Sequence, residues 1–179
     1  MKKFLVAIMV AFLSLSAMSS VSAHPRHHDS GGGDHDYKFT VKKELTISKR
    51  ALKKYRDIDV ALDEGFTGLV PGACVPNMGI HLIKPSRADD AKLHIKRPEI
   101  LVYEPLKDGS YKLVAAEWYV PAEETDKTPV LFREKFQGPM DNHDGSKGQH
   151  YDLHAWLFKK NPDGMFTPEN KRVSCEFAK

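Results

Sequence analysis

The chain has 179 residues, of which 41% are hydrophobic and 28% are charged, and its formal net charge is +3. The length fits one globular domain. The near balance of charge argues against a partner that requires a strongly basic surface, such as nucleic acid or an anionic membrane.

The N-terminal stretch has the pattern of an export signal. Two lysines precede an apolar run over residues 4–15, which is too short to span a bilayer comfortably, and the VSA sequence of residues 21–23 matches a cleavage site. We therefore predict a signal peptide over residues 1–23, a periplasmic or secreted protein, and no stable insertion in a membrane. Without the two lysines, 25 basic residues balance 24 acidic ones.

Residues 24–36, HPRHHDSGGGDHD, predict a disordered histidine-rich arm, because nothing in them can bury a core. Residues 37–179 then form a single globular domain. Histidines and a free amine are good ligands for Cu(II) or Ni(II), so accessory metal capture and a merely solvated arm both remain open. The histidines concerned are His24, His27, His28 and His35.

Residues 37–47 alternate apolar and polar side chains and predict an edge strand, after which Ser48 would cap the N-terminus of a helix. The helix should end near Gly65 and Gly68. Its apolar positions fall on one side of a helical wheel, and its lysines and arginines predict a solvated face. These apolar positions are Ala51, Leu52, Tyr55, Ile58, Leu62 and Phe66.

Four later segments predict strands, and the second and third read as a hairpin around the Lys107-Asp108-Gly109 turn. The long segment between the third and fourth strands, residues 121–148, is expected to be irregular. The predicted strands are residues 80–83, 98–105, 111–120 and 149–158. The sequence thus predicts an α+β fold with one amphipathic helix on an antiparallel sheet of four to five strands, with a small β-barrel or sandwich as the alternative. The core should include Leu52, Tyr55, Leu62, Leu101, Leu113, Leu153 and Leu157.

Cys74 and Cys175 are the two cysteines of the chain, and in an exported domain they are expected to pair. The bridge would close a loop of about 100 residues and contribute roughly 4–5 kcal/mol in the chain-entropy description. It would join the C-terminal segment to the loop that precedes His81.

Six short motifs, in order along the chain, resemble those of a family of exported bacterial proteins without an assigned activity. The resemblance covers roughly residues 60–175, and it implies that His81, Glu104, Glu117 and His154 belong to the motif blocks. The motifs are MGIH from Met78, PEILVYEP from Pro98, LVAAEWYV from Leu113, HYDLHAWLF from His150, NPDGMF from Asn161 and VSC from Val173.

The first functional hypothesis is a metal site that contains His81 and His154, with Glu117 or Glu104 as a third ligand. Such a donor set suits Zn, Cu or Fe and leaves a position for water or substrate. Glu117 lies among apolar neighbours in its strand, so its carboxylate must pair, bind a metal or shift its pKa. His150 lies about 13 Å from His154 along an extended strand and cannot chelate with it.

Two further hypotheses remain open. A metal-independent binding module could hold a small organic ligand in an aromatic pocket. The pocket residues would be Trp118, Tyr119, Trp156 and Phe158. An enzyme could instead use Glu117 to orient His154 for proton transfer, although no catalytic motif is present and no catalytic residue is assigned. The preferred prediction is an exported binding protein for a metal ion or a small ligand, and the sequence indicates no oligomeric state.

Overall fold

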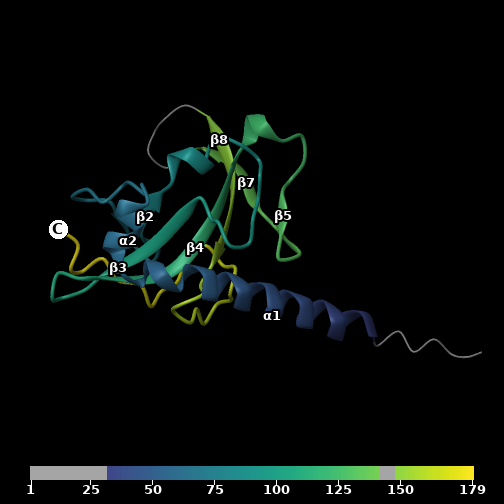
Figure 1. Ribbon diagram of the computed structural model, residues 1–179, viewed down its shortest axis with the longest axis horizontal. Helices are drawn as coiled ribbons and strands as arrows, with labels where there is room; N and C mark the ends of the chain where they lie inside the picture. Colours follow the sequence, from purple (N-terminus) through teal and green to yellow (C-terminus); the bar gives the residue numbers. More distant parts are fainter. Residues whose placement is uncertain (1–31, 142–147) are drawn as a thin grey trace, which may run out of the picture.

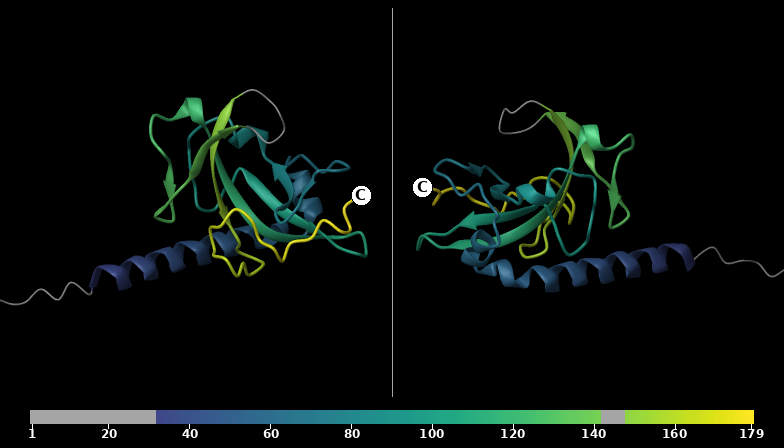
Figure 2. Two further views of the ribbon diagram at one scale, coloured as in Figure 1. Left: turned by 180° about the vertical axis from the view of Figure 1, so that it is seen from behind. Right: turned by 45° about the horizontal axis from the view of Figure 1, so that its top comes forward.

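The computed structural model describes residues 32–141 and 148–179. Its centre is an antiparallel sheet of six strands in the order β1-β2-β3-β4-β8-β7, curled into a half-barrel (Figure 1). The strands are β1 (Cys74–Val75), β2 (Gly79–Ile83), β3 (Ile100–Pro105), β4 (Tyr111–Pro121), β7 (Gln137–Asp141) and β8 (Gln149–Ala155). Helix α1 (Gly32–Leu52) lies across one side of the sheet, and its first turns extend beyond the sheet edge (Figures 1 and 2). The predicted α+β fold is confirmed.

Shorter elements connect these parts. The 3-10 turn η1 (Lys53–Arg56) and helix α2 (Ile58–Asp63) follow α1. The remaining elements are the 3-10 turns η2 (Pro85–Arg87) and η3 (Ala122–Glu124) and a small hairpin of β5 (Val130–Leu131) with β6 (Glu134–Lys135).

The edge strand predicted for residues 37–47 is wrong, because this segment belongs to α1. Val41 and Leu45 are four residues apart and pack together against the core, which is the spacing of one helix face. The spacing of the apolar residues fits both the two-residue period of a strand and the 3.6-residue period of a helix. Packing against the sheet favours the helix. The helix also includes residues 32–36, which the sequence assigned to the disordered arm. The rest of that arm and the predicted signal peptide lie outside the described residues.

Ser48 is not the N-cap of a helix, since it lies inside α1. Its Oγ lies 3.1 Å from the carbonyl oxygen of Glu44 and 2.6 Å from that of Ile95. The predicted single helix after Ser48 is instead divided into the end of α1, η1 and α2. The division falls at Asp57, which is extended and accepts a hydrogen bond from the backbone N–H of Asp59, so it starts a new helix.

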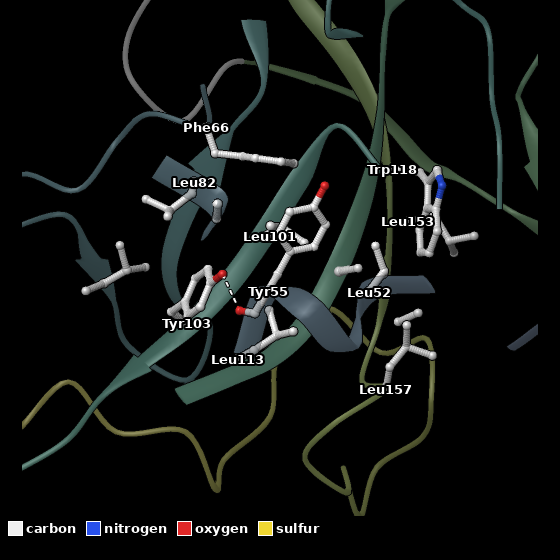
Figure 3. Packing of buried hydrophobic residues seen from close by; sticks show 14 of the residues in the cluster. Leu52, Tyr55, Phe66, Leu82, Leu101, Tyr103, Leu113, Trp118, Leu153 and Leu157 are labelled. Atoms are coloured by element: carbon white, nitrogen blue, oxygen red, sulfur yellow. Dashed lines mark hydrogen bonds between the residues drawn. The ribbon is translucent and has the colours of Figure 1, made fainter. Parts of the chain in front are cut away.

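The core lies between the sheet and the helical segments, as predicted. Tyr103, from β3, donates a hydrogen bond of 2.7 Å from its hydroxyl to the carbonyl oxygen of Tyr55 (Figure 3). This bond joins the sheet to η1 inside the core. Of the seven residues expected there, Leu62 is partly buried and packs against the cluster, and the other six belong to it. These six are Leu52, Tyr55, Leu101, Leu113, Leu153 and Leu157.

The segment 121–148, predicted to be irregular, contributes β7 to the sheet edge beside β8. The sequence pattern does not predict this strand, because Gly138 and Pro139 are residues that are uncommon in strands. The pairing shifts register between Gln137 and Met140, and such an irregularity at an edge accommodates a proline, which cannot donate to the strand ladder.

Cys74 and Cys175 form the predicted disulfide, which suggests an oxidising environment outside the cytoplasm. Near the bridge, the backbone N–H of Asn170 donates to the carbonyl oxygen of Asn77 at 2.8 Å. The C-terminal segment is therefore fixed to the hairpin that carries His81. None of the helices in the described part of the chain combines the length and apolar character that a membrane crossing needs.

Candidate metal centre

Three strands of the sheet place a histidine or a glutamate on the face opposite α1. Glu117 in β4 is directly opposite His154 in β8. His81, in β2, pairs with Val102 of β3. Val102 is two residues from Ile100, the β3 partner of Glu117, so His81 and Glu117 lie near each other on the same face. Strand alternation sends these side chains to the second face, away from the helix-side cluster. The apolar residues buried on that second face are Ile100, Val102, Val114, Ala115, Trp156 and Val173.

The three side chains meet at one carboxylate oxygen. Nε2 of His81 and Nε2 of His154 each lie 3.3 Å from Oε2 of Glu117. Each of the three residues offers one ligand atom, and these three atoms all lie within 4.8 Å of one another. For metal–ligand bonds of about 2 Å, neighbouring ligands of a tetrahedral ion are about 3.3 Å apart. The arrangement could therefore hold a metal ion.

The site is closed on most sides. The side chains of Glu117 and His154 are 4% and 1% exposed, whereas that of His81 is 23% exposed. The rings of His154 and Trp156 are stacked, with centroids 6.1 Å apart, and the His81 ring meets His154 edge-on at 5.8 Å. Solvent therefore approaches the group from the side of His81.

The electrostatics of the face favour a cation. Burial raises the pKa of the Glu117 carboxyl well above its ordinary value, and the negative charges of Asp152 and Glu99 raise it further. Oε2 of Glu117 makes no hydrogen bond with the described residues. A buried carboxyl in such surroundings is stabilised by a proton or by a bound positive ion.

Glu104 does not join this group, although the sequence proposed it as a ligand. Its two carboxylate oxygens accept hydrogen bonds of 2.5 and 2.6 Å from Lys159 Nζ, and one of them also accepts from the backbone N–H of Ser174. Glu104 is buried, with 6% of its surface exposed. Glu117 pairs with Ile100, which precedes Glu104 by four residues in β3, so Glu104 lies about 13 Å along the strand from the group.

The four aromatic residues proposed as one ligand pocket lie on both faces of the sheet. Trp118 is buried in the helix-side core, where Nε1 donates to the carbonyl oxygen of His94 at 3.0 Å. Phe158 packs against the same core, because β8 ends at Ala155 and the expected alternation stops there. Tyr119 and Trp156 lie with the second-face cluster. The four therefore do not surround a common cavity.

The histidines outside the group are separate from it. His94 is exposed on a loop. His24, His27, His28 and His143 lie outside the described residues, as does the side chain of His35. Accessory metal capture by the arm remains a prediction.

The sequence reasoning missed three buried polar residues around the group, namely His150, Asp152 and Glu99. His150 Nε2 lies 3.6 Å from Asp152 Oδ2, and the His150 ring stacks on Tyr119 at 4.9 Å between centroids. Burial raises the pKa of the Glu99 carboxyl to about 8. The two-residue period from His150 to His154 already placed Asp152 on the same side as both histidines.

Two imidazoles and one carboxylate can hold a divalent transition metal and leave at least one coordination position for water or a small molecule. A pair of His154 and Glu117 can also transfer a proton. Comparison of the chain with protein-family models, curated proteins and solved structures finds no match. The resemblance to a family of exported proteins therefore stays a prediction.

Proposed function

We propose that this chain is an exported protein that binds one divalent transition-metal ion, drawn from Zn, Cu and Fe. The ligands are Nε2 of His81, Nε2 of His154 and the carboxylate of Glu117. The observation that carries the proposal is the distance of 3.3 Å from each Nε2 to the same buried carboxylate oxygen. Oε2 of Glu117 makes no hydrogen bond with the described residues, and about 3.3 Å is the ligand spacing of a small tetrahedral ion.

The surroundings support the same proposal. A bound divalent ion would offset the buried negative charge of Glu117, whose pKa is raised by burial and by neighbouring carboxylates. The disulfide and the export-type N-terminus support action outside the cytoplasm. The partly exposed side of His81 gives the route by which a metal ion and its fourth ligand reach the site.

The test compares metal binding by full-length variants. To exclude the arm, His24, His27, His28 and His35 are changed to alanine in every protein. In this background His81→Ala should abolish tight binding of Zn(II), whereas the matched control His94→Ala, an exposed histidine, should retain one ion per chain. At a free metal concentration of 100 times Kd, binding should stabilise the fold by about 2.7 kcal/mol.

Calorimetric titration measures the stoichiometry and affinity, and chemical unfolding measures the stabilisation. The proposal fails if the arm-substituted parent binds no ion, or if His81→Ala and His94→Ala bind Zn(II) with the same affinity. Glu117→Gln is a second variant that alters a ligand. Glutamine has the same shape as glutamate, so the variant should weaken metal binding without leaving a cavity.

A second candidate function is metal-independent proton transfer by the His154–Glu117 pair. The raised pKa of Glu117 and its 3.3 Å separation from His154 favour this role. It requires that any turnover persist in protein treated with a chelator and disappear in Glu117→Gln. Loss of turnover on chelation alone would instead assign the reaction to the metal.

A further inference from the structure

Strand β8 carries three buried polar side chains on the face of the proposed metal centre. His150, Asp152 and His154 alternate along the strand, and each is 2% exposed. Only His154 belongs to the group of metal ligands. A carboxylate buried beside a ligand histidine requires an explanation, because an unpaired buried charge is costly.

Asp152 lies between the two histidines. Its Oδ1 is 4.0 Å from Nδ1 of His154, and its Oδ2 is 3.6 Å from Nε2 of His150. The two nitrogens of the His154 ring therefore have different acidic neighbours, since Nε2 is directed at Glu117 and Nδ1 at Asp152. Oδ1 of Asp152 makes no hydrogen bond with the described residues.

We infer that Asp152 is a positioning residue of the metal centre, which accepts the Nδ1–H of His154 while Nε2 binds the ion. The inference rests on the proposed metal function and goes beyond it, because Asp152 does not itself bind the metal. A ligand histidine commonly donates its other N–H to a carboxylate, which fixes the tautomer and ring orientation and makes the imidazole a stronger ligand. An approach of about 1 Å would bring the pair from 4.0 Å to hydrogen-bond distance.

The second carboxylate oxygen of Asp152 has its own neighbour, so the orientation of the carboxylate is fixed from both sides. Oδ2 faces His150, whose ring is held by stacking on Tyr119. The backbone of Asp152 is paired on both sides, with Tyr119 in β4 and with Gln137 in β7. The carboxylate is thus attached to a strand that cannot shift independently of its neighbours, and this rigidity is what orienting a ligand demands.

The test uses Asp152→Ala and the shape-matched Asp152→Asn in the full chain with the four arm histidines replaced. Co(II) is the probe, because its visible absorption reports the ligand geometry. Asp152→Ala should retain one ion per chain but bind it about 10- to 100-fold more weakly, with an altered absorption spectrum. Asp152→Asn should lose less, since its amide oxygen can still accept the Nδ1–H. The control is Asp141→Ala, an exposed aspartate at the end of β7.

Unfolding of the metal-free variants distinguishes positioning from a purely structural role, because a structural role lowers stability and leaves the Co(II) spectrum unchanged. The inference alone is overturned if the parent binds Co(II) and both Asp152 variants match it in affinity and spectrum. It is also overturned if Asp152→Ala loses the ion as completely as His81→Ala, which would make Asp152 a ligand. If the parent binds no ion, the proposed function and this inference fall together.

Discussion

Replacing Glu99 with glutamine should remove a large part of the pH dependence of folding in the metal-free protein. Burial raises the pKa of the Glu99 carboxyl from 4.5 to about 8, while the backbone N–H of Tyr119 opposes the shift by donating a hydrogen bond to Oε2. In the unfolded chain the same carboxyl ionises near its ordinary pKa of 4.5. Between these two pH values the folded protein holds a proton that the unfolded chain has released, so stability falls as the pH rises.

The size of the effect follows from the width of this window. Each pH unit costs up to about 1.4 kcal/mol of folding free energy, so the loss from pH 4.5 to pH 8 sums to at most about 5 kcal/mol. Glutamine carries no titrating proton, and its side-chain oxygen can still accept the Tyr119 N–H. The variant should therefore match the parent near pH 4.5 and exceed its stability by up to about 5 kcal/mol at pH 8 and above.

Urea unfolding with a chelator present and the disulfide intact measures both proteins from pH 5 to pH 8.5. The control is Glu124→Gln, which replaces an exposed acid. In this variant stability should change with pH as steeply as in the parent. If Glu99→Gln loses stability between pH 5 and pH 8 as steeply as the parent does, the carboxyl of Glu99 ionises normally in the folded protein. The reasoning from burial would then be refuted.

Three further predictions concern the fold. Serine at both Cys74 and Cys175, 101 residues apart, should lower the free energy of unfolding by about 4–5 kcal/mol in urea titrations, because the unfolded chain is no longer crosslinked. Tyr103→Phe should cost about 1–3 kcal/mol in the same assay, because it leaves the buried carbonyl of Tyr55 without its hydroxyl donor. Gly79→Ala should lower the thermal midpoint, since φ is +103° there and the added Cβ would lie 2.6 Å from the carbonyl oxygen of Tyr103.

Much of the fold could be predicted because the strands carry their own pattern. The apolar positions of β3 and β8 gave the core residues Leu101 and Leu153 on the correct side of the sheet. Strict alternation in β4 put Leu113 on the face of Glu117, whereas it lies in the helix-side core because the pairing with β3 shifts register between Val102 and Tyr103. The N-terminal helix could not be predicted in the same way. Residues 37–47 fit a strand and a helix about equally, and the contact that decides between them is made with a sheet formed later in the chain.

The sequence could predict which residues belong to the site, but it could not predict how their side chains are arranged in space. His81, Glu117 and His154 were each identified, but their meeting depends on strand order and register, which no single segment contains. Glu104 shows the consequence, because Glu117 pairs with Ile100, four residues earlier in β3, and the carboxylate of Glu104 contacts Lys159 instead. The position of Asp152 followed from a period of two, yet its role required knowing which nitrogen of His154 faces it.

The two faces of the sheet differ in what they contribute to stability. The helix-side face buries a continuous apolar core, whereas the opposite face buries Glu117 and Asp152 together with histidines, and Glu99 is buried close enough to raise the pKa of Glu117. Each buried carboxyl opposes folding unless a proton or a cation accompanies it. The crosslink from Cys74 to Cys175 can offset part of that cost, at about 4–5 kcal/mol. A metal ion at Glu117 would act in the same direction, so metal binding and folding of this face are expected to be thermodynamically coupled.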